Sequence, residues 1–297
     1  GTSMGTIAAL ASLVTQLSNQ GAFGIEIGAA SLVGGAMFGD NMSVISDTTI
    51  ASITSQKANL KEKLKLNFKV AIVASIITVT ILAFSDGPDI DIVNRDYQLL
   101  LILPYIFLII LAAIGVNVFI VLVTSLIFSG FIGAVIVDYN IMQFAQDISK
   151  GFHEMHEIML LSILIGALSG LSNQNSKELA QNIAKLLPKN AGKKAAELLI
   201  SLLVSLFDIL LANNVVAIIF SGEIAKELAE KYKIKPHETA AWLDIFSCVF
   251  QGIIPHGAQV LLICTIAHIS PLSVIGKVYY CYILAIVTIT YIIFRKR

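Results

Sequence analysis

The chain has 297 residues, of which 56% are hydrophobic and only 13% are charged, with a mean hydropathy of +0.83. Because soluble domains carry roughly 25% charged residues, this composition excludes disorder, collagen and a nucleic-acid-binding chain. Acidic and basic residues number 20 each, so no charged partner is indicated. The composition therefore predicts an all-α protein whose helices cross a lipid bilayer several times.

The beginning of the chain is a polar run, Gly1–Thr6, that leads directly into apolar sequence. It starts with Gly rather than Met and has no charged region typical of a signal peptide. We therefore expect a fragment of a longer protein whose earlier helices are missing. Cys248, Cys264 and Cys281 are odd in number and lack CxxC spacing, which argues against a disulfide framework or a zinc site.

Six stretches are long and apolar enough to approach the roughly 20 residues of a transmembrane helix. They are Phe68–Phe84, Leu99–Ile114, Asn117–Val137, Ile158–Leu171, Ala195–Phe220 and Pro271–Phe294. Only Gly115–Asn117 separates the second from the third, which predicts a tight helical hairpin. Two more regions, Ile25–Ser55 and Thr239–Ile269, are apolar but interrupted by glycine, proline and polar residues.

The charges of the loops predict the orientation, because basic loops stay in the cytoplasm. The basic segments are Lys57–Lys69, Lys177–Lys194 and Arg295–Arg297, and the acidic ones are Asp86–Asp96 and Asp138–Glu157. We expect a multi-pass protein of the cell (inner) membrane with a cytoplasmic C-terminus. The alternation requires residues 239–269 to form a re-entrant hairpin that enters and leaves on the outer side. Before it, Gly222–Glu238 reads as an amphipathic surface helix, with apolar residues every four positions.

A repeated pattern suggests two related halves. Asp40-x-x-Ser43-x-x-x-Asp47 resembles Asp244-x-x-Ser247-x-x-x-Gln251, and offsets of 0, 3 and 7 share one face of a helix. Polar breaks precede both copies, and the spans that follow them run in opposite directions. Inverted repeats with interrupted helices are typical of secondary transporters, although chance remains the alternative.

This reading divides the chain into two parts. Residues 1–137 hold the rest of a first inverted repeat and the first connecting helices. Residues 138–297 hold the second repeat, with a broken helix at 195–220, a re-entrant hairpin at 239–269 and a last span at 271–294.

Polar groups within the apolar segments are candidates for ion binding. Breaks at residues 1–6, 212–214 and 251–257 leave backbone carbonyls unpaired, which suits a hard cation such as Na⁺. Membrane carboxylates are costly and usually mark a pathway, and hydroxyl residues surround Asp47. The alternatives are close packing of small residues and an interfacial helix cap. Among the histidines, His256 follows Pro255 in a break and is a candidate for a proton-linked role, whereas His153 and His156 lack metal-site spacing.

Several runs resemble one known family. Gly1–Thr6, Gly39–Asn41 and Ile45–Thr49 resemble the NhaC-type sodium/proton antiporter family of the ion transporter superfamily, and Ala212–Ile218 and Leu243–Gln259 resemble its second repeat. Val215 and His256 stand where that pattern has a threonine and an aromatic residue. The resemblance implies a transporter rather than an enzyme, with no cofactor beyond the transported Na⁺ and protons.

We therefore expect a cation/proton antiporter that works by alternating access, with Na⁺ held by Asp47, Ser46 and Thr48. Asp47 is the expected shared carboxylate, because burial disfavours its charged form and Na⁺ then competes with a proton. The full set of expected cation-binding residues is Thr2, Ser3, Asp40, Ser43, Ser46, Asp47, Thr48, Thr49, Asn213, Asn214, Asp244, Ser247, Gln251 and Gln259, with Asp208 and His256 as proton-linked residues. The sequence leaves open whether the chain assembles into a homo-oligomer.

Two other functions are weighed. An organic-acid or amino-acid exchanger of the same fold needs a fixed positive charge, and the sequence places no Arg or Lys near the breaks. An intramembrane aspartyl protease needs a Gly-x-Gly-Asp motif. The run Ala36–Asp40 has methionine where the first glycine of that motif should stand.

Overall fold

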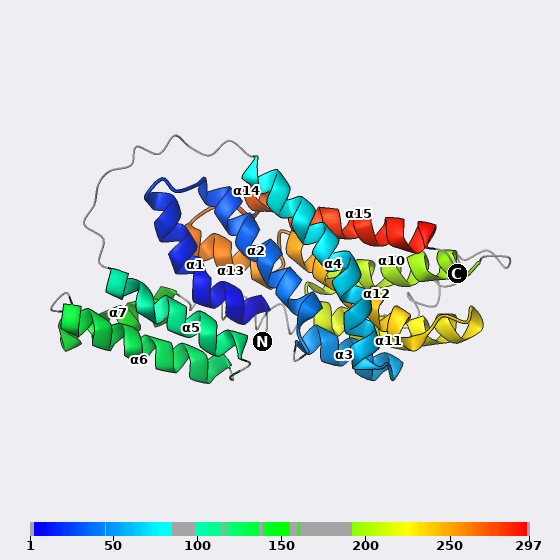
Figure 1. Ribbon diagram of the computed structural model, residues 1–297, viewed down its shortest axis with the longest axis horizontal. Helices are drawn as coiled ribbons and strands as arrows, with labels where there is room; N and C mark the ends of the chain where they lie inside the picture. The colour runs from blue at the N-terminus through cyan, green and yellow to red at the C-terminus, as the bar shows by residue number, and fades with distance from the viewer. Residues whose placement is uncertain are drawn as a thin grey trace. The chain divides into compact units, whose positions relative to one another are not determined.

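The computed structural model describes residues 3–44, 46–84, 99–114, 116, 118–136, 139–154, 160 and 192–295, and these form helices without any strand (Figure 1). They divide into two compact units. The smaller unit lies within residues 89–161, and the larger combines residues 2–88 with residues 162–297. Thr2, the loop Asp86–Asp96, the span Ile158–Leu171 apart from Leu160, and most of the loop Lys177–Lys194 lie outside the described residues.

The smaller unit contains the predicted helical hairpin. A short 3-10 turn, η1 (Leu99–Ile102), leads into α5 (Leu103–Ala113), which packs against α6 (Val118–Ile136). The rings of Phe107 and Phe128 hold the two helices together, with centroids 5.0 Å apart. The acidic segment that was expected as a loop instead contains α7 (Ile141–Glu154), because its apolar residues recur at helical spacing.

The larger unit contains two series of helices. The first series is α1 (Ser3–Asn19), α2 (Ile25–Met42), α3 (Asp47–Gln56) and α4 (Leu60–Ala83). The second begins with α10 (Lys193–Leu211) and continues through α11 (Asn214–Lys231), α12 (Pro236–Ile253), α13 (Ala258–Ala267), α14 (Pro271–Ile275) and α15 (Tyr279–Phe294).

The two series repeat with one constant shift of 211 residues. This shift carries the first residues of α1, α2, α3 and α4 onto those of α11, α12, α13 and α14, and the end of α4 onto the end of α15. The backbone repeats as well. Ser43 and Ile254 end the longer helices with φ/ψ of −78°/140° and −84°/130°, and Lys57 and His268 both adopt the left-handed conformation after the shorter ones.

This shift corrects the register of the predicted repeat. Aligning Asp40 with Asp244 requires a shift of 204 residues, whereas the helix boundaries place Gln251 in the position equivalent to Asp40. The structure also separates Asp40 from Asp47, because α2 ends at Met42 and α3 begins only at Asp47. The predicted single helical face through residues 40, 43 and 47 is therefore wrong.

The two series pack crosswise. Helix α1 of the first series contacts α13 of the second, and α11 contacts α3 in the same exchanged manner. Helices α2 and α12 contact each other, and each also contacts both α4 and α15. The breaks between α2 and α3 and between α12 and α13 are consequently flanked by helices of both series.

Ion pairs identify which helix ends lie together in this unit. At one end, the starts of α4 and α12 meet through Glu62 and His237, 2.7 Å apart, and the start of α12 meets the end of α15 through Glu238 and Arg295, 3.1 Å apart. At the other end, the start of α2 meets the segment before α15 through Glu26 and Lys277.

These contacts correct the predicted path of residues 239–269. The segment starts at the end marked by Glu62 and finishes beside α14, which packs against α2. It therefore runs from one end of the unit to the other and does not return as a hairpin. Instead, α10 and α11 return to their starting end, because Lys193 pairs with Glu238 at 2.7 Å and α11 ends just before α12 begins.

Among the residues that the structure describes, three helical stretches are long and apolar enough to cross a membrane: Leu60–Ala83, Phe119–Ile136 and Pro236–Ala267. The first begins eight residues before the predicted span, since Asn59 caps it by accepting a hydrogen bond from the Glu62 N–H at 3.2 Å. The predicted span Ala195–Phe220 is divided at Ala212 and Asn213, and the expected amphipathic helix is the second half of α11.

Candidate cation-binding site

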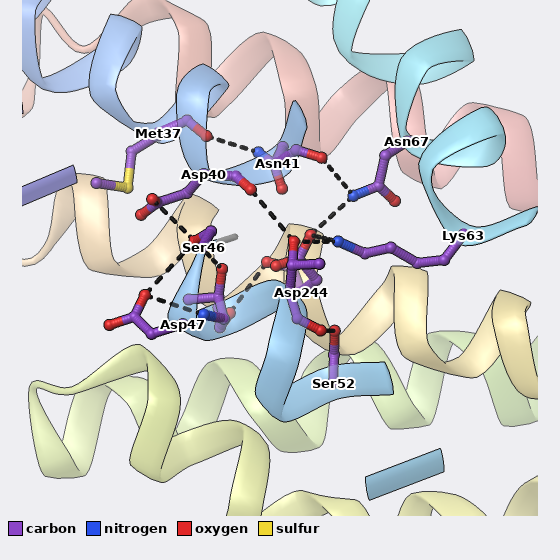
Figure 2. Close-up of polar contacts among 12 residues, drawn as sticks. Met37, Asp40, Asn41, Ser46, Asp47, Ser52, Lys63, Asn67 and Asp244 are labelled. Atoms are coloured by element: carbon purple, nitrogen blue, oxygen red, sulfur yellow. Dashed lines mark hydrogen bonds and ion pairs between the residues drawn. The ribbon is translucent and has the colours of Figure 1, made fainter. Parts of the chain in front are cut away.

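Asp40, in the last turn of α2, lies at the centre of a buried polar cluster (Figure 2). Its Oδ1 accepts one hydrogen bond from the Ser3 backbone N–H at the start of α1 and one from the Ser46 hydroxyl, both at 3.0 Å. The side chain is 1% exposed, and Oδ2 has no partner among the described residues. The N-terminus of a helix favours an anion, so this setting stabilises the carboxylate while one oxygen remains open to a ligand.

Ser46 connects the break between α2 and α3 to both carboxylates. Its hydroxyl lies 3.0 Å from Oγ1 of Thr48 and 3.4 Å from Oδ1 of Asp47. Thr48 is buried, whereas the side chain of Asp47 is exposed at the first turn of α3. Carboxylate and hydroxyl oxygens therefore converge on this break, and oxygen atoms are the ligands that hard cations require.

A buried ion pair lies next to this cluster. Nζ of Lys63 in α4 is 2.7 Å from Oδ2 of Asp244 in α12, and both side chains are 0% exposed. The ammonium group also donates to Oγ1 of Thr49 in α3, at 2.6 Å. Figure 2 shows the pair meeting between the two series of helices. The pair thus ties three helices together at the level of the breaks.

Asn67 extends the ion pair toward Asp40. Its amide donates to Oδ2 of Asp244 at 2.7 Å and to the backbone carbonyl of Asn41 at 2.9 Å. The Thr49 hydroxyl reaches the carbonyl of Asp40 at 3.4 Å. These bonds connect the Asp244 carboxylate to the backbone of Asp40 and Asn41 through a continuous set of polar groups.

The sequence analysis missed Lys63 and Asn67, because it counted their segment as a basic loop. The expectation that no lysine lies near the breaks is therefore wrong. A signal was present in the sequence: residues 63, 67, 70, 74 and 78 recur at helical spacing, and all of them are buried in α4.

The second series contributes an amide cluster on the other side of Ser3. Gln259 donates to the Ser3 hydroxyl at 3.1 Å and accepts from Nε2 of Gln251 at 2.6 Å. The same nitrogen of Gln251 lies 3.2 Å from the carbonyl of Ala212, which ends α10 in the left-handed conformation. Gln251 is 1% exposed, and its Oε1 has no partner among the described residues.

The other predicted residues occupy supporting positions. Asn213 caps α11 by accepting from the Val216 N–H at 3.1 Å, and the Ser247 hydroxyl bonds within its own helix to the carbonyl of Asp244. Ser43 is half-buried where α2 ends, and Asn214 is buried at the start of α11. His256 is exposed, with its ring 2.9 Å from the carbonyl of Ile209.

The donor set favours a cation that needs few protein charges. Within the described residues, no three His, Cys, Asp or Glu side chains gather as a transition-metal site would require. The breaks instead offer carboxylate, hydroxyl and amide oxygens together with the ends of interrupted helices, a combination that coordinates Na⁺ in secondary transporters.

The sequence model of one known family, described as the Na⁺/H⁺ antiporter family, matches residues 91–296, more than two thirds of the chain. No curated protein and no solved structure matches the chain. The matched region includes the whole second series of helices, with Asp208, Asp244 and Gln251. The chain therefore belongs to the Na⁺/H⁺ antiporter family, whose members are transporters and not enzymes.

Proposed function

We propose that this chain exchanges Na⁺ for protons by alternating access, and that Asp40 is the carboxylate shared by the two ions. The observation that carries this proposal is the setting of Asp40: a buried carboxylate with one oxygen held by Ser3 and Ser46 and the other without a partner among the described residues. The buried oxygen without a partner is costly until a proton or a cation completes it, and so the two ions compete.

The different burial of the two acidic residues supports Asp40 rather than Asp47 as the exchanging carboxylate. Asp47, the residue favoured by the sequence, is exposed, whereas Asp40 is buried beside both series of helices. We assign Asp40 to ion exchange and Asp47, through Ser46, to the path by which the cation reaches it.

We further propose that the two series are inverted repeats. The constant shift of 211 residues and the crosswise packing support this proposal. The ion-paired ends support it too, since α2 and α12 start at opposite ends of the unit. In this arrangement α10 and α11 form the re-entrant hairpin, α12 and α13 form an interrupted crossing helix, and the basic ends of α4, α10 and α15 face the cytoplasm of the cell membrane.

A carboxylate exchanger of the same fold is the second candidate, because Lys63 supplies a buried cation near the breaks. That charge is already compensated by Asp244, which leaves no net positive charge to hold an anionic substrate. The cation exchanger is therefore favoured, and organic acids belong in the same transport assay.

The test is Na⁺-driven proton flux in proteoliposomes that contain the purified protein. We expect Asp40→Asn to abolish proton release, because the amide cannot exchange a proton for Na⁺. Asp47→Asn is the matched control on the exposed carboxylate, and we expect it to retain transport with weaker apparent Na⁺ affinity. Transport by Asp40→Asn at the wild-type rate, or proton flux driven only by an added organic acid, would contradict the proposal.

A further inference from the structure

Asp208 is a buried carboxylate that the contacts described above leave unused. It lies on α10, one turn before the left-handed residue Ala212 that ends the helix. The side chain is 0% exposed, and neither of its oxygens has a hydrogen-bond partner among the described residues. None of the ion pairs among the described residues involves Asp208.

The side chain of Gln251 in α12 reaches the same end of α10. The side-chain amide of Gln251 donates to the carbonyl of Ala212, four residues after Asp208. That amide leaves Oε1 buried and without a partner in the described structure. Two side chains with unsatisfied oxygen atoms therefore gather at the tip of α10.

The repeat explains why this pairing matters. In the register of 211 residues, Gln251 occupies the position of Asp40, so the second series lacks the carboxylate that the first series has. Asp208 is a buried carboxylate on the neighbouring helix α10, near the helix end that the Gln251 amide contacts. The two sites are thus chemically similar although the residues that build them are not equivalent.

We propose that Asp208 and Gln251 form a second site for a monovalent cation, in which the carboxylate and the amide oxygen are direct ligands. An uncompensated charge within apolar surroundings is very costly, and no described cationic side chain pairs with Asp208. Na⁺, which the family transports, supplies the missing charge and fits oxygen ligands. This inference rests on the proposed function and adds to it a second cation in each transport cycle.

The test is equilibrium binding of radioactive ²²Na⁺ to the purified full chain, with the number of bound ions measured at saturation. We expect Asp208→Asn and Asp40→Asn each to bind one sodium ion fewer than the wild type, and the double variant to bind none. The variant that combines Asp208→Asn with Gln251→Glu moves the carboxylate from α10 to α12, and it should bind as many sodium ions as the wild type. A structural role of Asp208 would not be rescued in this way.

Thermal unfolding in detergent first establishes that each variant is folded. If Asp208→Asn does not fold, Gln251→Leu takes its place, and loss of one ligand should weaken binding of the second ion by about tenfold. Unchanged ion number in Asp208→Asn, or unchanged affinity in Gln251→Leu, overturns the second site. That result leaves the proposed function intact as long as Asp40→Asn still loses its ion and its proton flux.

Discussion

Lys63 and Asp244 form a buried ion pair in which each charge depends on the other. Both side chains are fully buried; Lys63 also donates to Thr49 and Oδ2 of Asp244 accepts from Asn67, whereas Oδ1 of Asp244 has no hydrogen-bond partner among the described residues. Burying two charges costs more than an isolated pair returns, so such a pair is a weak source of stability. Its integrity matters nevertheless, because either charge alone is left uncompensated.

We therefore expect Lys63→Met to destabilise the protein by about 3–5 kcal/mol, since it leaves Asp244 as an unpaired buried charge. The double variant Lys63→Met with Asp244→Leu should recover most of that loss, because no charge remains buried. Thermal unfolding of the three proteins in detergent measures both effects. Equal melting temperatures for the single and double variants would show that the two charges are not coupled.

Ser46 is the residue that links Asp40 to Asp47 and Thr48. We expect Ser46→Ala to weaken apparent Na⁺ affinity, with a smaller effect on the maximal rate, because one cation ligand and one bond to Asp40 are lost. Ser221→Ala is the matched control: that hydroxyl is equally buried but bonds only to Ala217 of its own helix. Transport assays over a range of Na⁺ concentrations measure the apparent affinity and the maximal rate of each variant. An effect of the same size in both variants would argue against a role in binding.

The sequence predicted the acidic and hydroxyl residues of the site, because carboxylates stand out within apolar segments. It did not predict which carboxylate is buried, since that depends on where α2 ends, and Asp40 and Asp47 lie only seven residues apart. It also assigned Lys63 to a loop, because charge alone does not distinguish a paired buried lysine from a solvated one.

At the scale of the helices, glycine, proline and polar residues located the breaks at 212–214 and 251–257, but not the break between α2 and α3, because residues 40, 43 and 47 were placed on one helical face. The register of the repeat was not predictable from matching side chains, because the two copies conserve backbone geometry rather than residue type. Ser46 and Gly257 begin the shorter helices with nearly the same φ and ψ, −63°/140° and −69°/138°. Only the helix boundaries, taken together, reveal that the two residues are equivalent.

Gly257 is nonetheless required by close packing in its own break. A Cβ atom there would lie 2.9 Å from the carbonyl oxygen of Gln251 and 3.2 Å from that of Ile254, and backbone atoms cannot easily move away. We expect Gly257→Ala to destabilise the protein by roughly 1–3 kcal/mol. Gly35→Ala, inside α2 where nothing lies within 4 Å, should be neutral or slightly stabilising. Thermal unfolding compares the stabilities of the two variants. An unchanged melting temperature of Gly257→Ala would mean that the backbone of the break moves to accommodate the added methyl group.

At the scale of the larger unit, the polar contacts that surround the site cross from one series of helices to the other. Ser3 bonds to Gln259, Lys63 pairs with Asp244, and Gln56 donates to the carbonyl of Gly222 at 2.9 Å. A movement of one series against the other would therefore remodel the surroundings of Asp40. This is the property that alternating access requires, since the same site must open first to one side and then to the other.

Inverted repeats make a strong prediction about sidedness. Residues at the helix ends that are related by the shift of 211 must lie on opposite faces of the membrane, and Lys61 and Leu272 form such a pair with both side chains exposed. Single cysteines at these positions, in a protein without Cys248, Cys264 and Cys281, should react with a membrane-impermeant maleimide from opposite sides of intact vesicles.

A cysteine in place of Lys235 is the control for this experiment. That residue lies two positions before His237, whose ring contacts Glu62 at the start of α4, and so it must react from the same side as Lys61. If the cysteines at Lys61 and Leu272 react from the same side, the two series are parallel rather than inverted repeats. If those at Lys61 and Lys235 react from opposite sides, the path of α12 described here is wrong. If the cysteines at positions 61 and 235 react from one side and the cysteine at position 272 reacts from the other, the inverted arrangement fits both the ion pairs and the repeat.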